Sequence, residues 1–159
     1  MPSIMLSEYL DPGLVFGKGT IKAGSKNDLL RQLASKVSNF HKGLSPGIVY
    51  KALLERESEH STGLGLGLAL PHALLDGIDR PVLAAAVLDQ PIDFSADDCI
   101  PVDVVVMILS PSSGETIHLR ILARVARLLT NGDMQEKLRK AGKRELFDIL
   151  INEDKSHVY

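Results

Sequence analysis

The sequence predicts an α/β fold in which a mixed β-sheet is flanked by helices on both faces, forming a three-layer sandwich. Two observations lead to this prediction. Segments with apolar residues at helical spacing alternate along the chain with short apolar runs of the kind that form strands. Two of those runs, 82–88 and 102–109, are apolar on both faces, which is typical of strands covered by helices on either side.

Length and composition predict a single domain spanning 1–159. The chain has 159 residues, of which 45% are hydrophobic and 24% are charged, and it contains no repeat, low-complexity segment or dividing linker. The formal net charge of −2 arises from mixed signs, so no basic field is available for nucleic acid. We therefore expect a protein that does not bind nucleic acid.

Cysteine usage and hydropathy predict a cytoplasmic location. The single cysteine, Cys99, excludes an internal disulfide framework and fits a reducing compartment. No apolar run approaches the roughly 18 residues of a membrane span. The first ten residues lack the basic and apolar regions of a signal peptide. We expect no membrane insertion.

Two helices are expected before residue 60. The first, over 26–40, follows a capping-box pattern in which Ser25 precedes Asp28 by three residues. The second begins at Ser45-Pro46, where an N-cap residue is followed by a proline suited to the first helical position, and ends near Glu57. Apolar residues at helical spacing support the first helix: Leu29, Leu30, Leu33, Val37 and Phe40.

The remaining local structure is expected from turn signals and periodicity. We expect a turn at Asp11-Pro12-Gly13, short strand fragments at 14–16 and 20–21, and a loop across 90–98. Further helices are expected from about 116 to 129, from 134 to 141 and from 145 to 151.

The stretch 61–73 combines a strand pattern with a histidine at its end. Read with period two, it places four leucines on one face, at 64, 66, 68 and 70, and leaves the other face nearly bare at Gly63, Gly65, Gly67 and Ala69. Pro71 cannot donate to a β-ladder, so the strand is expected to end there. His72 would then lie just beyond the strand end, where its side chain can meet solvent.

Three other interpretations of the chemistry-bearing residues fit less well. The glycines at 63, 65 and 67 do not have the spacing of a dinucleotide-binding loop, and no Lys-Ser/Thr pair follows them. His60, His72 and His118, taken with Cys99, lack the short paired spacings of zinc sites. No Gly-x-Ser-x-Gly elbow presents a serine nucleophile.

Two further residues each have a structural and a functional interpretation. His118 lies near the start of the helix expected from 116, beside its core stripe. It is either a solvated first-turn residue, which spacing alone favours, or a partner of His72 at the same sheet edge. Arg56 is either a cation favoured by a helix C-terminus or a fork for a phosphate.

Several segments occur in the order of a known family. They are Leu53-Leu54-Glu55-Arg56-Glu57, Ser61 to His72, Pro91-Ile92-Asp93-Phe94, Pro101-Val102-Asp103-Val104 and His118-Leu119. Through these segments, nearly the whole chain resembles the IIA components of the bacterial phosphoenolpyruvate-dependent phosphotransferase system, of the fructose/mannitol class. The resemblance is closest to the stand-alone nitrogen-regulatory IIA proteins, since no permease or carrier domain is fused at either end. It implies one IIA type-2 domain over 1–159.

The resemblance also implies the site. His72 matches the histidine that becomes phosphorylated, and His118 matches a second histidine that hydrogen-bonds the phosphoryl group, so the two rings are expected to converge. Arg56 matches an arginine that lines the same pocket. Leu66 and Ala73 depart from the pattern, because relatives often have a polar residue and a glycine there.

The implied function is that of a phosphotransferase with a phosphohistidine intermediate, a phosphoryl relay with a regulatory output in nitrogen, potassium or carbon metabolism. The donor would be a histidine phosphocarrier protein (HPr-like), and regulatory proteins would be targets. No metal or other cofactor is implied, since side chains and backbone amides meet the charge. Two alternatives stay open. One is a sugar-specific IIA component that passes phosphate to a IIB component during fructose/mannitol-type uptake; the other is a protein-binding regulator whose His72 is not phosphorylated.

Overall fold

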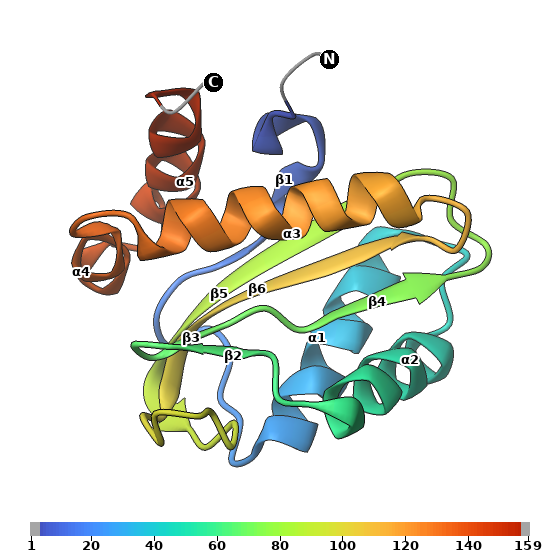
Figure 1. Cartoon of the computed structure of the whole chain (residues 1–159), viewed down its shortest axis with the longest axis horizontal. Helices are drawn as coiled ribbons and strands as arrows, with labels where there is room; N and C mark the ends of the chain where they lie inside the picture. Colours follow the sequence, from blue (N-terminus) through green and yellow to red (C-terminus); the bar gives the residue numbers. More distant parts are fainter. Residues whose placement is uncertain (1–3, 157–159) are drawn as a thin grey trace.

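The computed structural model describes residues 4–156 and arranges six strands of this range in one mixed sheet between two helical layers (Figure 1). The predicted fold class is confirmed. The strands are β1 (Leu10–Phe16), β2 (Gly63–Gly65), β3 (Leu68–Ala69), β4 (His72–Leu75), β5 (Val82–Ile92) and β6 (Val102–Pro111). The helices are the 3-10 turn η1 (Leu6–Glu8), α1 (Lys26–Phe40), α2 (Pro46–Glu59), α3 (Glu115–Thr130), α4 (Met134–Lys140) and α5 (Glu145–Ser156).

The sheet is organised around β6. The strand order is β1-β5-β6-β3-β2, and β4 also pairs with β6. The β5–β6 pair is antiparallel, whereas β3 and β4 both run parallel to β6, at different heights along it. Because β4 follows β3 closely in sequence, the chain continues along the same edge of β6, from Val104–Val105 to Ile108–Pro111.

The two faces of the sheet carry separate clusters of buried side chains. Helices α1 and α2 cover one face, and α3, α4 and α5 cover the other. Alternate residues of β6 serve the two clusters: Val105 and Met107 face α1 and α2, whereas Val104 and Val106 face α3. This two-sided burial explains why the run 102–109 is apolar throughout.

The first two helices begin where the sequence predicts. The Ser25 hydroxyl accepts a hydrogen bond from the Asp28 backbone N–H at the start of α1, and Ser45 does the same at the start of α2. Helix α1 ends at Phe40, as predicted. Helix α2 continues two residues beyond the predicted end, to Glu59.

The stretch 63–70 forms a tight hairpin, so the prediction of one strand with four leucines on a shared face was wrong. Strands β2 and β3 pair antiparallel. From the last residue of β2 through the turn, Gly65, Leu66 and Gly67 have φ of +87°, +59° and +80°, a left-handed conformation that glycine adopts readily and leucine rarely. Consequently Leu66 is exposed at the tip, whereas Leu68 is fully buried.

Two distant side chains hold this hairpin tip. The Asp98 carboxylate accepts a hydrogen bond from the Leu66 backbone N–H at 2.8 Å. On the other side, Arg139 of α4 donates to the Leu66 carbonyl at 2.6 Å and to both carboxylate oxygens of Asp103 at 2.9 Å. The unusual backbone of Leu66 is therefore fixed by contacts far away in sequence.

Other local predictions also required correction. Residues 11–13 lie within β1, where an edge position and a register irregularity accommodate Pro12. Thr20-Ile21 forms no strand. Strand β5 continues through Ile92 into the expected loop, by way of a register irregularity after Val87. Helix α5 extends to Ser156, and its last turn is held by the buried Asp154, which accepts hydrogen bonds from the Leu6 backbone N–H at 2.7 Å and from Arg124 of α3 at 2.6 Å.

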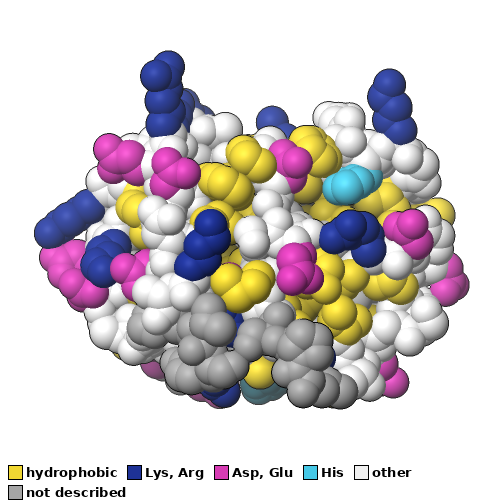
Figure 2. Space-filling view, turned by 90° about the horizontal axis from the view of Figure 1, so that it is seen from above, with side chains coloured by type: hydrophobic (Ala, Val, Ile, Leu, Met, Phe, Trp, Pro, Cys, Tyr) yellow, Lys and Arg dark blue, Asp and Glu magenta, His cyan; other side chains and the backbone are white. Residues whose placement is uncertain are grey.

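The outer surface of the molecule on the side of α3 and α5 carries side chains of both charges. Figure 2 views this face, and basic and acidic side chains are interspersed there with apolar ones. Within residues 4–156, no helix has both the length and the apolar character needed to cross a bilayer.

Candidate active site

His72 opens strand β4 instead of following a strand, so its predicted place just past a strand end needs correction. The proline before it has no N–H to donate, but its carbonyl still accepts a hydrogen bond from the Ile108 backbone N–H at 3.0 Å. His72 itself pairs with Ile108 in parallel register. Pairing with β6 therefore resumes at once after Pro71, and the half-buried imidazole lies at the start of the short strand β4.

Two contacts define the tautomer of His72. The Nδ1 atom lies 2.8 Å from the Leu70 carbonyl oxygen, which can only accept, so Nδ1 carries the proton. The Nε2 atom accepts a hydrogen bond from the Arg56 Nε at 3.1 Å, which requires a lone pair on Nε2. Both contacts therefore agree that Nε2 is the nucleophilic nitrogen.

The surroundings of His72 favour its neutral form. Burial lowers the pKa of His72 below its usual 6.5, and the nearby Arg56 charge acts in the same direction. The hydrogen bond to the Leu70 carbonyl opposes this shift without reversing it. At neutral pH the ring is thus uncharged and its Nε2 lone pair is present.

Arg56 reaches His72 from the last turn of α2. Its Nη1 donates to the His60 carbonyl at 2.9 Å, just beyond the end of the helix. This second contact fixes the plane of the guanidinium while Nε points at the imidazole. The functional interpretation of Arg56, a fork for an anion, thus has a fixed geometry beside the nucleophile.

His118 of α3 is buried, only 4% exposed, so the expectation of a solvated first-turn residue was wrong. Its ring centroid lies 5.4 Å from that of His72, and the two ring planes are inclined by 52°. The predicted convergence of the two histidines is confirmed. Burial, followed by the influence of His72, lowers the pKa of His118 to about 4, so this ring too is neutral at physiological pH.

Ser110 is a site residue that the sequence interpretation missed. It lies near the end of β6, is completely buried, and places its hydroxyl oxygen 2.6 Å from the Nδ1 of His118. The signal was present in the sequence, because a lone hydroxyl at the end of a strongly apolar run must find a partner when it is buried.

Glu57 is a second residue that the sequence interpretation missed, and it contacts the segment next to the site without lining the pocket itself. Its carboxylate is 3% exposed and forms an ion pair with Lys26 of α1 at 3.2 Å. It also accepts hydrogen bonds from the Thr62 backbone N–H at 3.0 Å and from the Thr62 hydroxyl at 2.5 Å. Glu57 thereby fixes the segment 60–62, whose His60 carbonyl holds Arg56.

Two adjoining pockets meet at Arg56 and His72. One, of about 370 Å³, is lined by polar and apolar side chains of the segment 60–72 and of α3, with Arg56. The other, of about 470 Å³, lies between α2, β4 and α3 and includes His118. Three carboxylates line this second pocket: Glu55, Glu59 and Glu115.

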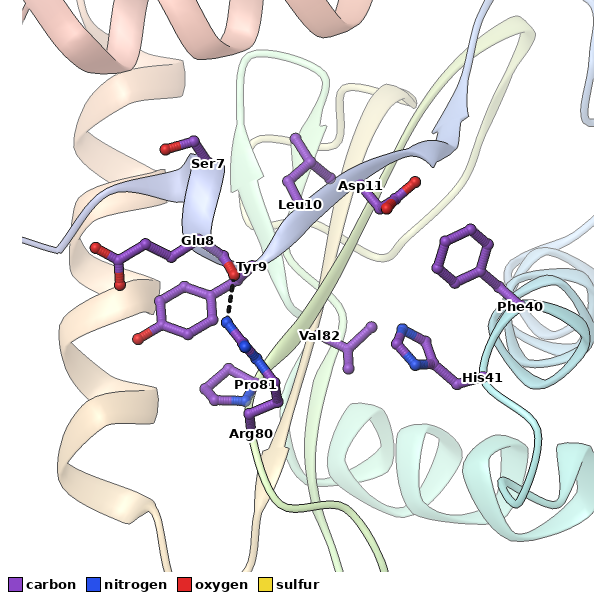
Figure 3. A pocket seen from close by; sticks show the side chains of 10 residues that line it. All are labelled: Ser7, Glu8, Tyr9, Leu10, Asp11, Phe40, His41, Arg80, Pro81 and Val82. Atoms are coloured by element: carbon purple, nitrogen blue, oxygen red, sulfur yellow. Dashed lines mark hydrogen bonds between the residues drawn. The ribbon is translucent and has the colours of Figure 1, made fainter.

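A third pocket, of about 250 Å³, lies away from these residues, around η1, the start of β1 and the end of α1 (Figure 3). Its guanidinium group belongs to Arg80, which donates to the Glu8 carbonyl at 2.5 Å and lies 5.5 Å from the centre of the Tyr9 ring. These contacts engage Arg80 with its own chain, so this pocket is a weaker candidate for chemistry.

The His72 pocket suits transfer of an anionic group to nitrogen. It combines a neutral nucleophilic imidazole, a fixed guanidinium and a second neutral imidazole within contact distance. In the described part of the chain, no three His, Cys, Asp or Glu side chains are arranged to hold a metal ion. A phosphoryl group is the common biological anion that nitrogen can accept and pass on.

Sequence comparison gives one consistent family. Residues 8–153 match the family model described as phosphoenolpyruvate-dependent sugar phosphotransferase system, EIIA 2. The chain is 34% identical over 150 residues to a nitrogen regulatory protein of Pseudomonas aeruginosa, covering 94% of this chain and 96% of the relative. It is 43% identical over 100 residues to the PTS system fructose-specific EIIA component of Haloferax volcanii, covering 62% and 65% of the two chains.

Solved structures agree with the sequence comparison. The nitrogen regulatory protein IIA-Ntr from Neisseria meningitidis superposes with a TM-score of 0.84 at 27% identity, covering 91% of this chain and 98% of that one. The IIA mannitol protein of Escherichia coli superposes with a TM-score of 0.73 at 19% identity, covering 88% and 97%. The second likeness is one of fold.

Proposed function

This chain belongs to the EIIA type 2 family of the phosphoenolpyruvate-dependent sugar phosphotransferase system, and from that premise we propose that it is a regulatory phosphoryl relay whose His72 accepts the phosphoryl group. The observation that carries the proposal is the position of the His72 Nε2. This atom has a lone pair, lies beside the Arg56 guanidinium and belongs to a ring that is within reach of His118. Relatives named nitrogen regulatory protein support the regulatory output.

The transfer step needs no proton movement at the nucleophile. The His72 Nε2 lone pair attacks phosphorus as the N–P bond of a phosphohistidine donor breaks in line, and the donor imidazole leaves with the electron pair. The His72 ring gains positive charge while Nδ1 keeps its proton. The Leu70 carbonyl oxygen, which already accepts a hydrogen bond from the Nδ1–H at 2.8 Å, stabilises the charge as it develops.

Arg56 and His118 meet the charge of the phosphoryl oxygens. Arg56 is already within hydrogen-bond distance of Nε2, so a small shift brings its donors to oxygens of a group bound there. His118 approaches the same ring from α3, on the other side of the pocket from α2. The chemistry of the site is therefore positioning and charge neutralisation by side chains.

The donor we propose is a histidine phosphocarrier protein (HPr-like). The pocket that contains His118 is rimmed by Glu55, Glu59 and Glu115, so a donor that carries basic side chains around its phosphohistidine is favoured electrostatically. The phosphorylated and free forms of His72 differ in charge at the same surface. Regulatory protein targets can distinguish the two forms by that difference.

A second candidate function is that of a sugar-specific component. The relative from Haloferax volcanii, 43% identical over 100 residues, is named as a fructose-specific EIIA component. In that role His72 would accept phosphate in the same way and then pass it to a IIB component. The two candidates share the first half-reaction and differ only in the acceptor.

A reconstituted relay tests the proposal. The protein is incubated with phosphoenolpyruvate, the first enzyme of the system and an HPr-like carrier. The phosphoryl group that it acquires is the label, and mass spectrometry locates it. We expect one acid-labile, base-stable phosphoryl group on the wild type and on His41→Ala, and none on His72→Ala. Labelling that persists in His72→Ala would overturn the assignment. Rapid passage of the label to a fructose-type IIB component would favour the sugar-specific role.

A further inference from the structure

The environment of Ser110 sets it apart from the rest of β6. Ser110 pairs with Leu74 of β4 and is completely buried in a strand whose other interior residues are apolar. Side chains two apart on a strand share a face, so Ser110 lies on the same side of the sheet as Ile108, the side that α3 covers. The fold thus directs this hydroxyl toward α3, the helix that carries His118.

The direction of the Ser110–His118 hydrogen bond follows from counting protons. A hydroxyl has one proton, and a neutral imidazole has one proton shared between two nitrogens. Among residues 4–156, the hydrogen-bond partner of the Ser110 hydroxyl is the His118 Nδ1, at 2.6 Å. If Nδ1 carried the imidazole proton, the buried serine proton would have no acceptor, which is unfavourable. Donation from serine to Nδ1 satisfies both groups.

The tautomer matters because His118 stays neutral. Burial lowers the pKa of His118 to about 4, so at physiological pH only one of its nitrogens can donate. A proton on Nδ1 would leave Nε2 with a lone pair, which would repel phosphoryl oxygens. A proton on Nε2 provides a donor to them.

We propose that Ser110 is a positioning residue of the site: by donating to the Nδ1 of His118 it fixes the His118 proton on Nε2, so that this ring offers a donor to a phosphoryl group on His72. The tautomer itself is a property of the resting protein. Its role in transfer rests on the proposed function of His72.

The resting tautomer is tested without any phosphoryl donor. Long-range ¹H–¹⁵N correlation spectra of the ¹⁵N-labelled protein near pH 7.5 report which imidazole nitrogen is protonated. We expect His118 with a protonated Nε2 and an Nδ1 that accepts a hydrogen bond. In Ser110→Ala the His118 Nδ1 resonance shifts, because this nitrogen no longer accepts a hydrogen bond from the serine hydroxyl. In the matched control Ser113→Ala, whose side chain is exposed on the following turn, the His118 resonances stay in place.

Two spectroscopic results would overturn the inference. One is a wild-type His118 with its proton on Nδ1, and the other is a Ser110→Ala spectrum with unchanged His118 nitrogens. Either result concerns Ser110 alone and leaves the labelling of His72 as a separate outcome.

A double-mutant cycle tests the role of Ser110 in transfer. We expect Ser110→Ala to slow acceptance of the phosphoryl group roughly 3- to 10-fold, the effect of about one hydrogen bond. In a His118→Ala background the same serine change should cost nothing further, because Ser110 acts through His118. An equal effect in both backgrounds would contradict the positioning role. Circular dichroism and the unfolding midpoint verify that each variant is folded.

Discussion

The Nε of Arg56 lies 3.1 Å from the Nε2 of His72, directly in front of the lone pair that attacks phosphorus in the proposed transfer. In that transfer the phosphoryl group takes the place that the resting guanidinium occupies. As the phosphoryl group arrives, the Arg56 N–H has to exchange its hydrogen bond to the His72 nitrogen for one to a phosphoryl oxygen. Because the second anchor of Arg56, the His60 carbonyl, lies just beyond the end of α2, this exchange requires only a local rotation.

Removing the guanidinium should slow transfer without abolishing it. In Arg56→Ala the nucleophile stays in place, but a donor to a charged oxygen is lost in a partly dried site, worth on the order of 2–4 kcal/mol. We expect a rate roughly 30- to 1,000-fold lower, with His72 still the labelled residue. Arg56→Lys should recover only part of the loss, since an ammonium lacks the planar fork. Initial rates of labelling measure this, and a wild-type rate in Arg56→Ala would contradict the assigned role.

The pH dependence of acceptance should follow the neutral form of His72. Its pKa lies below 6.5, so at pH 6.5 more than half of the molecules carry the Nε2 lone pair. The rate should therefore hold above half of its alkaline plateau at pH 6.5 and decline only at lower pH. An NMR titration of the His72 ring gives the same midpoint independently. A midpoint at or above 6.5 would show that burial does not control this group.

Glu57 should matter for stability as much as for the site. Glu57→Ala leaves the part-buried Lys26 ammonium and the Thr62 N–H without their carboxylate, and an unpaired buried polar group costs about 1–3 kcal/mol. The exposed Glu55 on the same helix provides a control, because surface substitutions usually change stability by less than about 0.5 kcal/mol. Urea unfolding of Glu57→Ala and Glu55→Ala gives the comparison. Equal stabilities would mean that the Glu57 network contributes little.

Local sequence signals predicted the layers and the helix starts because their causes are local. Ser25 and Ser45 cap helices through hydrogen bonds that span three residues, and runs that are apolar on both faces reflect burial between two helical layers. His72, Arg56 and His118 were likewise singled out from the sequence, with Arg56 and His118 each open to a structural and a functional interpretation. Their meeting depends on three elements that the sheet brings together.

The failures have causes that are distant in sequence. Alternating glycine and leucine has period two whether the chain runs straight or turns, and the left-handed Leu66 is held by Asp98 and Arg139. Glu57 resembles an ordinary charge near a helix end until Thr62 and Lys26 fold onto it. Patterns of a few residues carry no information about such contacts.

The nitrogen that receives the phosphoryl group tests the central claim most directly. The protein is labelled with ¹⁵N, phosphorylated through the carrier, and examined by long-range ¹H–¹⁵N and ³¹P spectra. Because Nδ1 donates to the Leu70 carbonyl and Nε2 holds the lone pair, we predict a single phosphorus bonded to the Nε2 of His72. Phosphorus on the Nδ1 of His72, or on any other residue, would contradict the account.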